Sequence, residues 1–475
     1  MRARKLPPVE NEYQGGDLGD ERRDARLVRI GRRLEEEPSQ GLPRLMGSDA
    51  ELEAFYRFIN SQAFEAEDIL EPHVERTLER CRAEGTVLAL HDTTQFDFPG
   101  EGREGLSFTT QGKNGFLAHV SLYASGRTGM PLGVGQALTW TREKKAKKGA
   151  RRVKERGAEP PKESERWLEA VEAIEEQRGN ASFQVIHVTD SEGDCFELLS
   201  LLAHGGSRFV IRAFQKARRV GREGERTSLG EAIAEAEAIS KRAVSVQVRK
   251  KRIGGEAFAK RKKRNWGRNA REARLCLGTT SVEFSRTPDT RGPGEPFQVN
   301  VVRVWEPSPP EGELPIEWVL LTTEDISSAN KAWEVVEIYR RRWLIEDYFK
   351  ALKTGCSFEK RQVESYAALT KVLALFMPIA YRLLLLRGLE RDSPDADPRT
   401  VFSETDLFLL ANALPVPAPI AKTLSEALLQ LARHGGHIKN NGPPGWQTLS
   451  LGYEKLLTLR LGWALRGLAT NVINP

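Results

Sequence analysis

The chain has few cysteines, and their positions exclude two classes of small stabilised fold. Cys81, Cys195, Cys276 and Cys356 are scattered among 475 residues without CxxC spacing. This argues against a disulfide framework or a zinc site, and it fits a reducing cytoplasm. The length itself exceeds what one hydrophobic core supports and predicts about three domains.

The sequence also lacks the features of membrane and secreted proteins. No run of 18 apolar residues is free of charge, and the first residues, MRARKLPPVENEY, contain no apolar signal segment. The longest apolar stretch, 369–386, includes Lys371, Pro378 and Arg382, so it predicts a buried core helix. We therefore expect a soluble, cytoplasmic protein that does not use a membrane.

Positive charge is concentrated in two short windows. Residues 142–156 carry a balance of +7 and residues 249–274 a balance of +10, whereas the whole chain carries +6, which leaves −11 for the remainder. Solvated surface charge is the ordinary explanation of a single basic run. Two separate runs, one with Trp266 inside KRKKRNWGRN, favour a polyanion such as nucleic acid as partner.

The hydrophobic periodicity changes along the chain. Residues from about 10 to 84 have helical spacing, and Gly85 ends that pattern. Three strands are predicted at 86–96, 115–124 and 131–140, followed by helix 163–177, strand 183–190, helix 195–205 and strand 207–213. This order predicts an α/β core, a mixed sheet with flanking helices.

The second half of the chain is predicted to hold an insertion and a helical end. Residues 216–316 interrupt the alternation with basic and strand-like segments, and we interpret them as a β-rich insertion. The core resumes at strand 316–323 and a long helix that begins near Ser328 and ends at Thr354, with Gly355 as its stop. The predicted domains are 1–84, helical; 85–215, the first part of the α/β core; 216–316, the insertion; 317–370, the rest of the core; and 371–475, helical.

Two aspartates follow apolar strand patterns. Asp92 ends the run VLALH and Asp190 ends VIHVT, so both are predicted at the rim of the sheet, where ligands often bind. Each one alone is more often a turn or helix-capping residue, and Asp194 competes with Asp190 for that capping role. His91, His119 and His187 lie in strands without ligand spacing and are interpreted as structural.

The long helix carries an unusual polar stripe. Its members are separated by 3, 4, 4 and 3 residues and share one helical face: Tyr339, Arg342, Glu346, Lys350 and Lys353. A simple ion pair of Glu346 with Arg342 or Lys350 is the ordinary alternative. Together with two aspartates, however, Glu346 completes three carboxylates, the hard oxygen ligands that two divalent ions about 4 Å apart require for phosphodiester cleavage.

These residues resemble a known family. Tyr339-x2-Arg342-x3-Glu346-x6-Lys353 matches the YREK motif of bacterial cut-and-paste DDE transposases of the transposon-five type, and the resemblance extends over nearly the whole chain. Residues 18–27 and 54–59 resemble the end-recognition domain, and residues 431–438 resemble the dimerisation domain. Residues 91–94, 188–194, 318–325 and 344–355 resemble the blocks around the three carboxylates.

The resemblance implies an RNase H-like catalytic domain and a set of functional residues. Asp92, Asp190 and Glu346 would be the catalytic metal ligands, holding two Mg²⁺ ions, with Mn²⁺ as the possible substitute. The residues implied to contact DNA are Tyr339, Arg342, Lys350, Lys353, Arg212 and Trp318, the last by stacking on a flipped base; a core role is the alternative for Trp318. The family carries an arginine where this chain has Ser191.

The N-terminal helices supply further candidates for DNA recognition, namely Arg22, Arg23, Arg26 and Arg57. The expected partners are double-stranded DNA, as transposon inverted-repeat ends and target, and a second copy of the chain. The expected reactions are nicking by water, hairpin formation, hairpin opening and strand transfer. An RNase H-fold nuclease and a non-catalytic DNA-binding descendant are the alternatives.

Overall fold

The computed structural model describes residues 6–100, 103–109, 113–142, 165–179, 182–222, 224–246, 271–287, 294–311, 313–438 and 444–473. Packing divides the chain into two units. The first consists of residues 1–185 together with 343–475, and the second of residues 186–342. Both predicted basic windows lie largely outside the described residues, and Trp266 is among those not described.

Helices form the N-terminal part of the first unit, as predicted. They are η1 (Val9–Glu12), α1 (Glu21–Glu36), α2 (Leu42–Met46), α3 (Asp49–Ile59) and α4 (Ala66–Glu84). Asp20 caps α1 by accepting a hydrogen bond from the Arg22 N–H, and Leu27 and Leu34 are buried at the predicted spacing. Gly85, with φ of 76°, ends α4 in a conformation that favours glycine.

Three long antiparallel strands follow α4, which confirms the prediction. The strands of this unit are β1 (Thr86–Phe98), β2 (Ser107–Phe108), β3 (Asn114–Ser125) and β4 (Pro131–Trp140). β3 pairs with both β1 and β4, and β2 pairs with the start of β3. α5 (Glu165–Arg178) covers this sheet, and Ile174 packs there with Val87, Tyr123 and Cys81 in a buried cluster.

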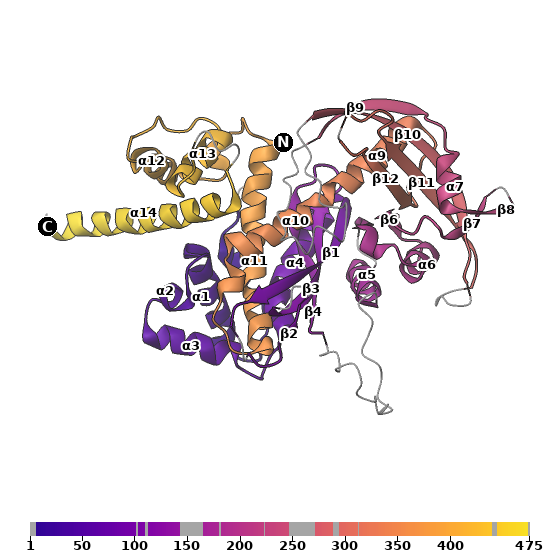
Figure 1. The fold of residues 1–475 in the computed structure, drawn as a ribbon. Helices are drawn as coiled ribbons and strands as arrows, with labels where there is room; N and C mark the ends of the chain where they lie inside the picture. The colour runs from indigo at the N-terminus through magenta and orange to yellow at the C-terminus, as the bar shows by residue number, and fades with distance from the viewer. Residues whose placement is uncertain are drawn as a thin grey trace. The chain divides into compact units, whose positions relative to one another are not determined.

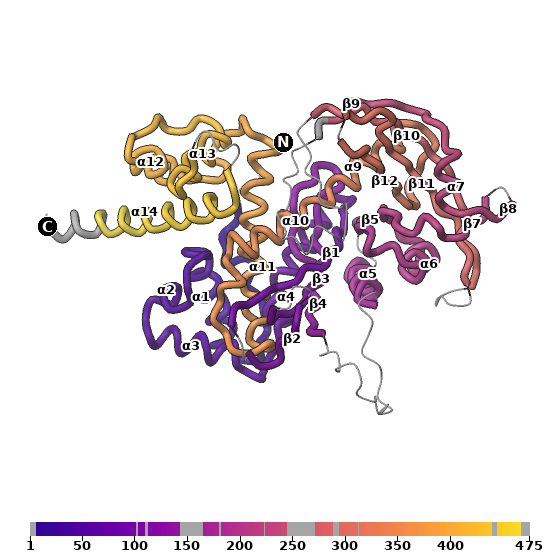
Figure 2. Tube along the Cα trace, viewed as in Figure 1, coloured from indigo at the N-terminus to yellow at the C-terminus, as the bar shows by residue number. Residues whose placement is uncertain are grey.

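The remainder of the first unit is helical, as predicted. It contains α10 (Trp343–Lys350), η3 (Ala351–Gly355), η4 (Phe358–Lys360), α11 (Tyr366–Asp392), η5 (Pro398–Thr400), α12 (Glu404–Asn412), α13 (Leu424–His434) and α14 (Trp446–Ile473). Figures 1 and 2 show α1, in indigo, beside α11, in orange, although the two are far apart in the sequence. α14 packs against α12 and α13 and extends past them toward the C-terminus (Figure 1).

α11 is the predicted core helix. Among the described residues it is the one helix long and apolar enough to cross a membrane, but 94% of its most apolar window is buried inside the protein. Its two buried cations have protein partners, because Lys371 donates to the Ser61 carbonyl and Arg382 pairs with Glu35 of α1. A helix that packs in this way satisfies the same test for length and hydropathy without a membrane.

The second unit is a mixed sheet with helices on it. Its elements are β5 (Gln184–Thr189, which begins at the unit boundary), η2 (Ser191–Gly193), α6 (Phe196–His204), β6 (Arg208–Arg212), β7 (Arg219–Arg222), β8 (Glu225–Ser228), α7 (Leu229–Ala234), β9 (Ser240–Val246), β10 (Arg271–Phe284), β11 (Phe297–Trp305), β12 (Glu317–Thr322) and α9 (Ala329–Arg341). β5 and β6 are parallel, whereas β12, β11, β10 and the hairpin β7–β8 pair antiparallel. The predicted mixed sheet is therefore present.

The predicted β-rich insertion, 216–316, contains strands that join a larger sheet. Its strands β10 and β11 are hydrogen-bonded in sequence to β12, so they extend the sheet that β5 and β6 begin. The compact units also meet at 185/186 and 342/343, rather than at the boundaries predicted from composition. Strand pairing brings sequence-distant segments together, and composition alone does not record it.

Candidate active site

The predicted carboxylates belong to two units. Asp92 and Glu346 lie in the first and Asp190 in the second. We therefore describe the surroundings of each within its own unit.

Asp92 lies where the buried part of β1 ends. Val87 to His91 are fully buried, whereas Asp92 and the three residues after it are half-buried. Its Oδ1 accepts a hydrogen bond from the Thr93 N–H at 2.8 Å. β1 continues to Phe98 and remains paired with β3, so Asp92 ends the buried run but lies within the strand, as in the predicted strand 86–96. Asp92 is accessible because burial decreases along β1 at this residue, and not because the strand ends there.

Glu346 lies on α10, which packs against β1 within the first unit. Leu344, Ile345 and Tyr348 form the buried face of α10, and the Tyr348 hydroxyl donates to the Met377 carbonyl of α11 at 3.2 Å. Glu346 itself is half-buried. The packing of α10 thus fixes the helix that carries Glu346 to the strand that carries Asp92.

The predicted continuous helix is interrupted twice. At Arg342 the backbone N–H bonds to the Tyr339 carbonyl, three residues back, which tightens the turn and separates α9 from α10. Residues 351–355 then form a π-helical turn. The segment ends at Gly355, one residue beyond the predicted Thr354, but Gly355 is not left-handed; the left-handed residue is Ser357, with φ of 48°.

Lys353 connects the glutamate segment to β1. Its Nζ donates to the Gln95 carbonyl at 2.6 Å and lies 5.3 Å from the centre of the Phe96 ring. Burial lowers the pKa of Lys353, while the carboxylates of Glu359, Asp97 and Asp92 act in the opposite direction. This ammonium is therefore close enough to Asp92 to feel its charge.

Glu359 is a residue that the sequence pattern did not reveal. Its Oε1 accepts a hydrogen bond from the Asp97 N–H of β1 at 3.0 Å. The charge of the Glu359 carboxylate also acts to raise the pKa of Lys353. Glu359 lies in the short η4 helix, and no spacing relates it to the YREK residues. Only the folded chain brings it to β1.

Lys350 differs from Lys353 in its surroundings. It is exposed, its Nζ is 2.9 Å from Asp347 Oδ1, and it lies over the Trp343 ring at 5.4 Å. Lys350 thus forms an ion pair with Asp347 on the same helix. An exposed pair of this kind contributes little to stability.

Asp190 follows β5, at the end of the strand as predicted. Its Oδ1 accepts the Glu192 N–H at 2.8 Å and caps η2, so the capping role weighed from the sequence is present. Asp190 is nevertheless half-exposed. Asp194, in contrast, has a fully buried side chain, accepts two backbone N–H groups and forms an ion pair with Arg218 at 2.7 Å. The packing therefore assigns the structural role to Asp194 and leaves Asp190 at the surface.

Four predicted DNA contacts lie in the second unit. Arg212 in β6 is half-buried and opposite Leu320 of β12. Trp318 in β12 is half-buried and meets the Tyr339 ring edge-on, at 6.1 Å between ring centres. Arg342 lies over the other partner of this pair, 5.9 Å from the centre of the Tyr339 ring. Trp318 is consequently not a residue of the closed core.

The predicted N-terminal arginines divide into exposed and engaged side chains. Arg22 and Arg57 are largely exposed, with 93% and 73% of their side-chain surface accessible. Arg23 donates to the Leu18 carbonyl, and Arg26 contacts Glu51 of α3 at 3.3 Å. Arg22 and Arg57 are thus the two that present most of their surface to a ligand.

The strand histidines have structural surroundings. His91 shares a hydrogen bond with Ser121 and His119 shares one with Thr93, and their rings stack at 5.9 Å. Burial lowers the pKa of His119 to about 3. His187 is likewise fully buried, in β5.

Carboxylate oxygens are the donors that Mg²⁺ prefers, and half-buried Asp92, Asp190 and Glu346 fit such an ion chemically. Among the residues that the structure describes, however, no three His, Cys, Asp or Glu side chains gather as a metal-holding group. The shared metal role of the three carboxylates therefore stays a prediction.

Comparison with protein families gives two matches. Residues 8–64 match the family model described as transposase DNA-binding, and residues 197–377 match that described as transposase DDE domain. The first match covers α1 to α3 with Arg22 and Arg57, and the second contains Glu346 and the strands from β6 to β12. Together the two matches support a DNA transposase, with a DNA-binding segment before a DDE segment.

Proposed function

We propose that this protein is a cut-and-paste DNA transposase whose Asp92, Asp190 and Glu346 act together in one RNase H-like catalytic site. The observation that carries the proposal is the packing of α10 on β1. This packing joins the helix of Glu346 to the strand of Asp92. Lys353, at the end of the same segment, interacts electrostatically with the Asp92 carboxylate. The two family matches support a DNA transposase, and the second match contains Glu346.

The three carboxylates would hold two divalent ions, Mg²⁺ or in its place Mn²⁺. When bound, such ions lower the pKa of an attacking water and neutralise charge on the transferred phosphoryl group. The part of the chain is to keep the carboxylates ionised and fixed in position. Backbone N–H groups of Thr93 and Glu192 donate to Asp92 and Asp190 and help to hold these carboxylates in position.

Cations near the carboxylates would bind DNA phosphates. Arg342 is suited to bidentate phosphate contact, and exposed Lys350 to contact as a point charge. Lys353 donates to the Gln95 carbonyl, so its contact with DNA would require an exchange of that hydrogen bond for one to a phosphate. Its burial and its carboxylate neighbours instead support a role in positioning β1.

The proposed reaction sequence uses one site repeatedly. Water attacks a phosphodiester at the transposon end and releases a 3′-hydroxyl, which then attacks the opposite strand and forms a hairpin. A second water opens the hairpin, and the 3′-hydroxyl attacks target DNA. Trp318, half-exposed in β12, would stack on a base that leaves the duplex during hairpin formation.

The remaining parts of the proposal concern organisation. The N-terminal helices would recognise the inverted-repeat ends through Arg22, Arg23, Arg26 and Arg57, and the basic segment 249–274 would bind the backbone. Residues 216–316 would act as an insertion within the catalytic domain. The C-terminal helices would join two copies of the chain on paired ends, in the cytoplasm of a bacterium.

The test is cleavage of end-containing DNA by carboxamide variants. Asp92→Asn, Asp190→Asn and Glu346→Gln should each abolish Mg²⁺-dependent nicking and leave end binding within a few-fold of the wild type, because the ligands act as one unit. Glu334→Gln, an exposed change on α9, is the matched control and should nick normally. Nicking by any of the three variants would remove that residue from the site. Nicking without strand-transfer products would favour the nuclease alternative.

A further inference from the structure

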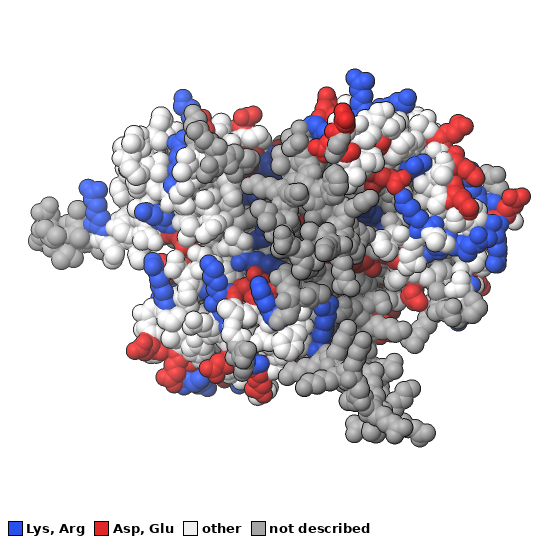
Figure 3. Space-filling view, viewed as in Figure 1, with Lys and Arg blue, Asp and Glu red and all other residues white. Residues whose placement is uncertain are grey.

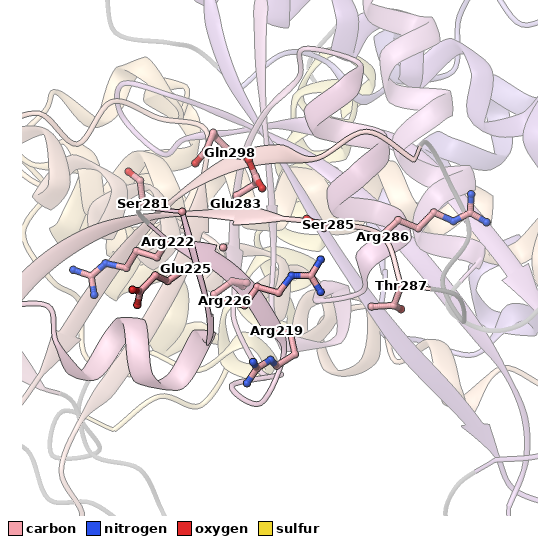
Figure 4. Close-up of a pocket in the computed structure, with 13 residues that line it drawn as sticks. Arg219, Arg222, Glu225, Arg226, Ser281, Glu283, Ser285, Arg286, Thr287 and Gln298 are labelled. Carbon is pink, nitrogen blue, oxygen red and sulfur yellow. Dashed lines mark hydrogen bonds between the residues drawn. The ribbon is translucent and has the colours of Figure 1, made fainter.

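A groove lined by arginines lies in the second unit, around the β7–β8 hairpin. It has a volume of about 280 Å³ and is formed by the β7–β8 hairpin and the end of β10. Figure 4 shows Arg222 and Arg286 toward its two sides, with Arg219 and Arg226 between them. Figure 3 shows Lys and Arg side chains gathered near the β7–β8 end of this unit.

The lining carries an excess of positive charge. Four arginines face two glutamates, Glu225 and Glu283, along the groove. Glu283 receives a hydrogen bond from Gln298 at 3.4 Å, and Arg222 pairs with Glu235 outside the lining. Arg219, Arg226 and Arg286 are exposed. Ser285 and Thr287 add hydroxyl groups to the same groove, whereas the Ser281 hydroxyl donates to Asn300 Oδ1 at 2.8 Å.

Contacts next to β7 fix the hairpin that forms the groove. Arg218, the residue before β7, is buried, pairs with Asp194 at 2.7 Å and lies 5.1 Å above the centre of the Phe284 ring in β10. Because Asp194 follows η2, this ion pair ties the hairpin to the loop that carries Asp190. The backbone positions of the exposed arginines are thus fixed by the folded structure and not left to a free loop.

We propose that this groove binds the phosphodiester backbone of DNA without regard to sequence. Exposed guanidinium groups beside hydroxyls match phosphate oxygens, which accept bidentate hydrogen bonds from arginine. The proposal rests on the proposed function and adds a second DNA contact, connected through Asp194 to the proposed catalytic loop.

The test is the salt dependence of binding to a labelled duplex of random sequence, measured by fluorescence anisotropy. The logarithm of the observed binding constant, Kobs, falls linearly with the logarithm of the salt concentration. Each lost phosphate contact makes this negative slope less steep by about 0.9 for duplex DNA. The triple variant Arg219→Gln, Arg226→Gln, Arg286→Gln should therefore lose roughly 2 to 3 slope units. The matched control is Arg76→Gln, Arg399→Gln, Lys422→Gln, which removes the same charge from other surfaces and should keep the wild-type slope.

The outcomes separate this proposal from the proposed function. If the triple variant has the slope of the control, the groove does not bind DNA, whereas Mg²⁺-dependent nicking by the wild type would leave the transposase assignment standing. If the wild type binds no DNA at any salt, both are overturned. Should the triple variant fail to fold, judged by circular dichroism, Arg226→Gln alone decides. Its slope should fall by about 0.9, and an unchanged slope would refute the groove.

Discussion

Replacing Trp318 by alanine should separate hairpin formation from the first nick. Trp318 is half-buried in β12 and touches the Tyr339 ring edge-on, so one part of the indole packs on the protein and another is accessible. The first nick needs the carboxylates, water and an accessible phosphodiester. The attack across the duplex also needs a distorted backbone, which a base stacked on the indole would stabilise.

The size of the effect follows from stacking energies. Base–aromatic stacking contributes about 1–3 kcal/mol per base. At about 1.4 kcal/mol per factor of ten, its loss would slow hairpin formation roughly 5- to 150-fold. The aromatic contact with Tyr339 contributes about 0.5–1.5 kcal/mol to folding, so the variant should remain folded but somewhat less stable.

The assay is a time course on end-containing DNA, resolved on a denaturing gel. The nicked strand should accumulate with Trp318→Ala, and Trp318→Phe should restore part of the hairpin rate. Trp305→Ala is the matched control, because Trp305 is a half-buried tryptophan of the neighbouring strand β11 with Arg303 4.6 Å from its ring centre. It should lose similar stability but form hairpins normally. Equal slowing of nicking and hairpin formation by Trp318→Ala would refute the stacking role.

Two further predictions concern stability. Asp194→Asn should lower the free energy of unfolding of the second unit by about 3–5 kcal/mol, because the substitution leaves the Arg218 charge without its partner. Urea unfolding followed by hydrogen exchange in β6 and β7 measures this loss of stability. A loss no larger than that caused by Asp190→Asn, at a half-exposed residue, would contradict the prediction. Burial by itself raises the pKa of Glu12, but His73 and Arg80 outweigh it and hold that pKa at about 2. Because the folded-state pKa lies below the unfolded value, this carboxylate stabilises the first unit above about pH 4.5, and the contribution is lost as the pH falls toward 2. Thermal unfolding between pH 7 and pH 2.5 should show this loss for the wild type, and Glu12→Gln should flatten the curve; an equally steep curve for the variant would contradict the assignment.

Local pattern was sufficient for most elements of the fold. Apolar residues at intervals of three to four positions predicted the N-terminal helices, and apolar runs predicted β1, β3, β4 and β5. These patterns reflect which face of an element is covered. The order of these elements indicated a mixed sheet with helices. The end of β5 at Thr189 also followed from the sequence, since the apolar run stops there and Asp190 caps the next turn.

Other features depended on contacts between distant residues. β1 continues past Asp92 because β3 supplies hydrogen-bond partners as far as Asn114, and α9 and α10 are separate because of a tightened turn at Arg342. Asp194 and Asp190 look alike in the sequence, and only the buried ion pair with Arg218 distinguishes their roles.

The chemistry of the candidate site divides in the same way. The sequence by itself determined which side chains are available, namely the carboxylates and cations of the YREK spacing, because residue type fixes charge and donor atoms. Only the tertiary structure decided what surrounds them. Lys353 meets the Gln95 carbonyl, and Glu359 meets β1, because α10 packs on that strand. Such contacts join residues more than 250 positions apart, and no local pattern encodes them.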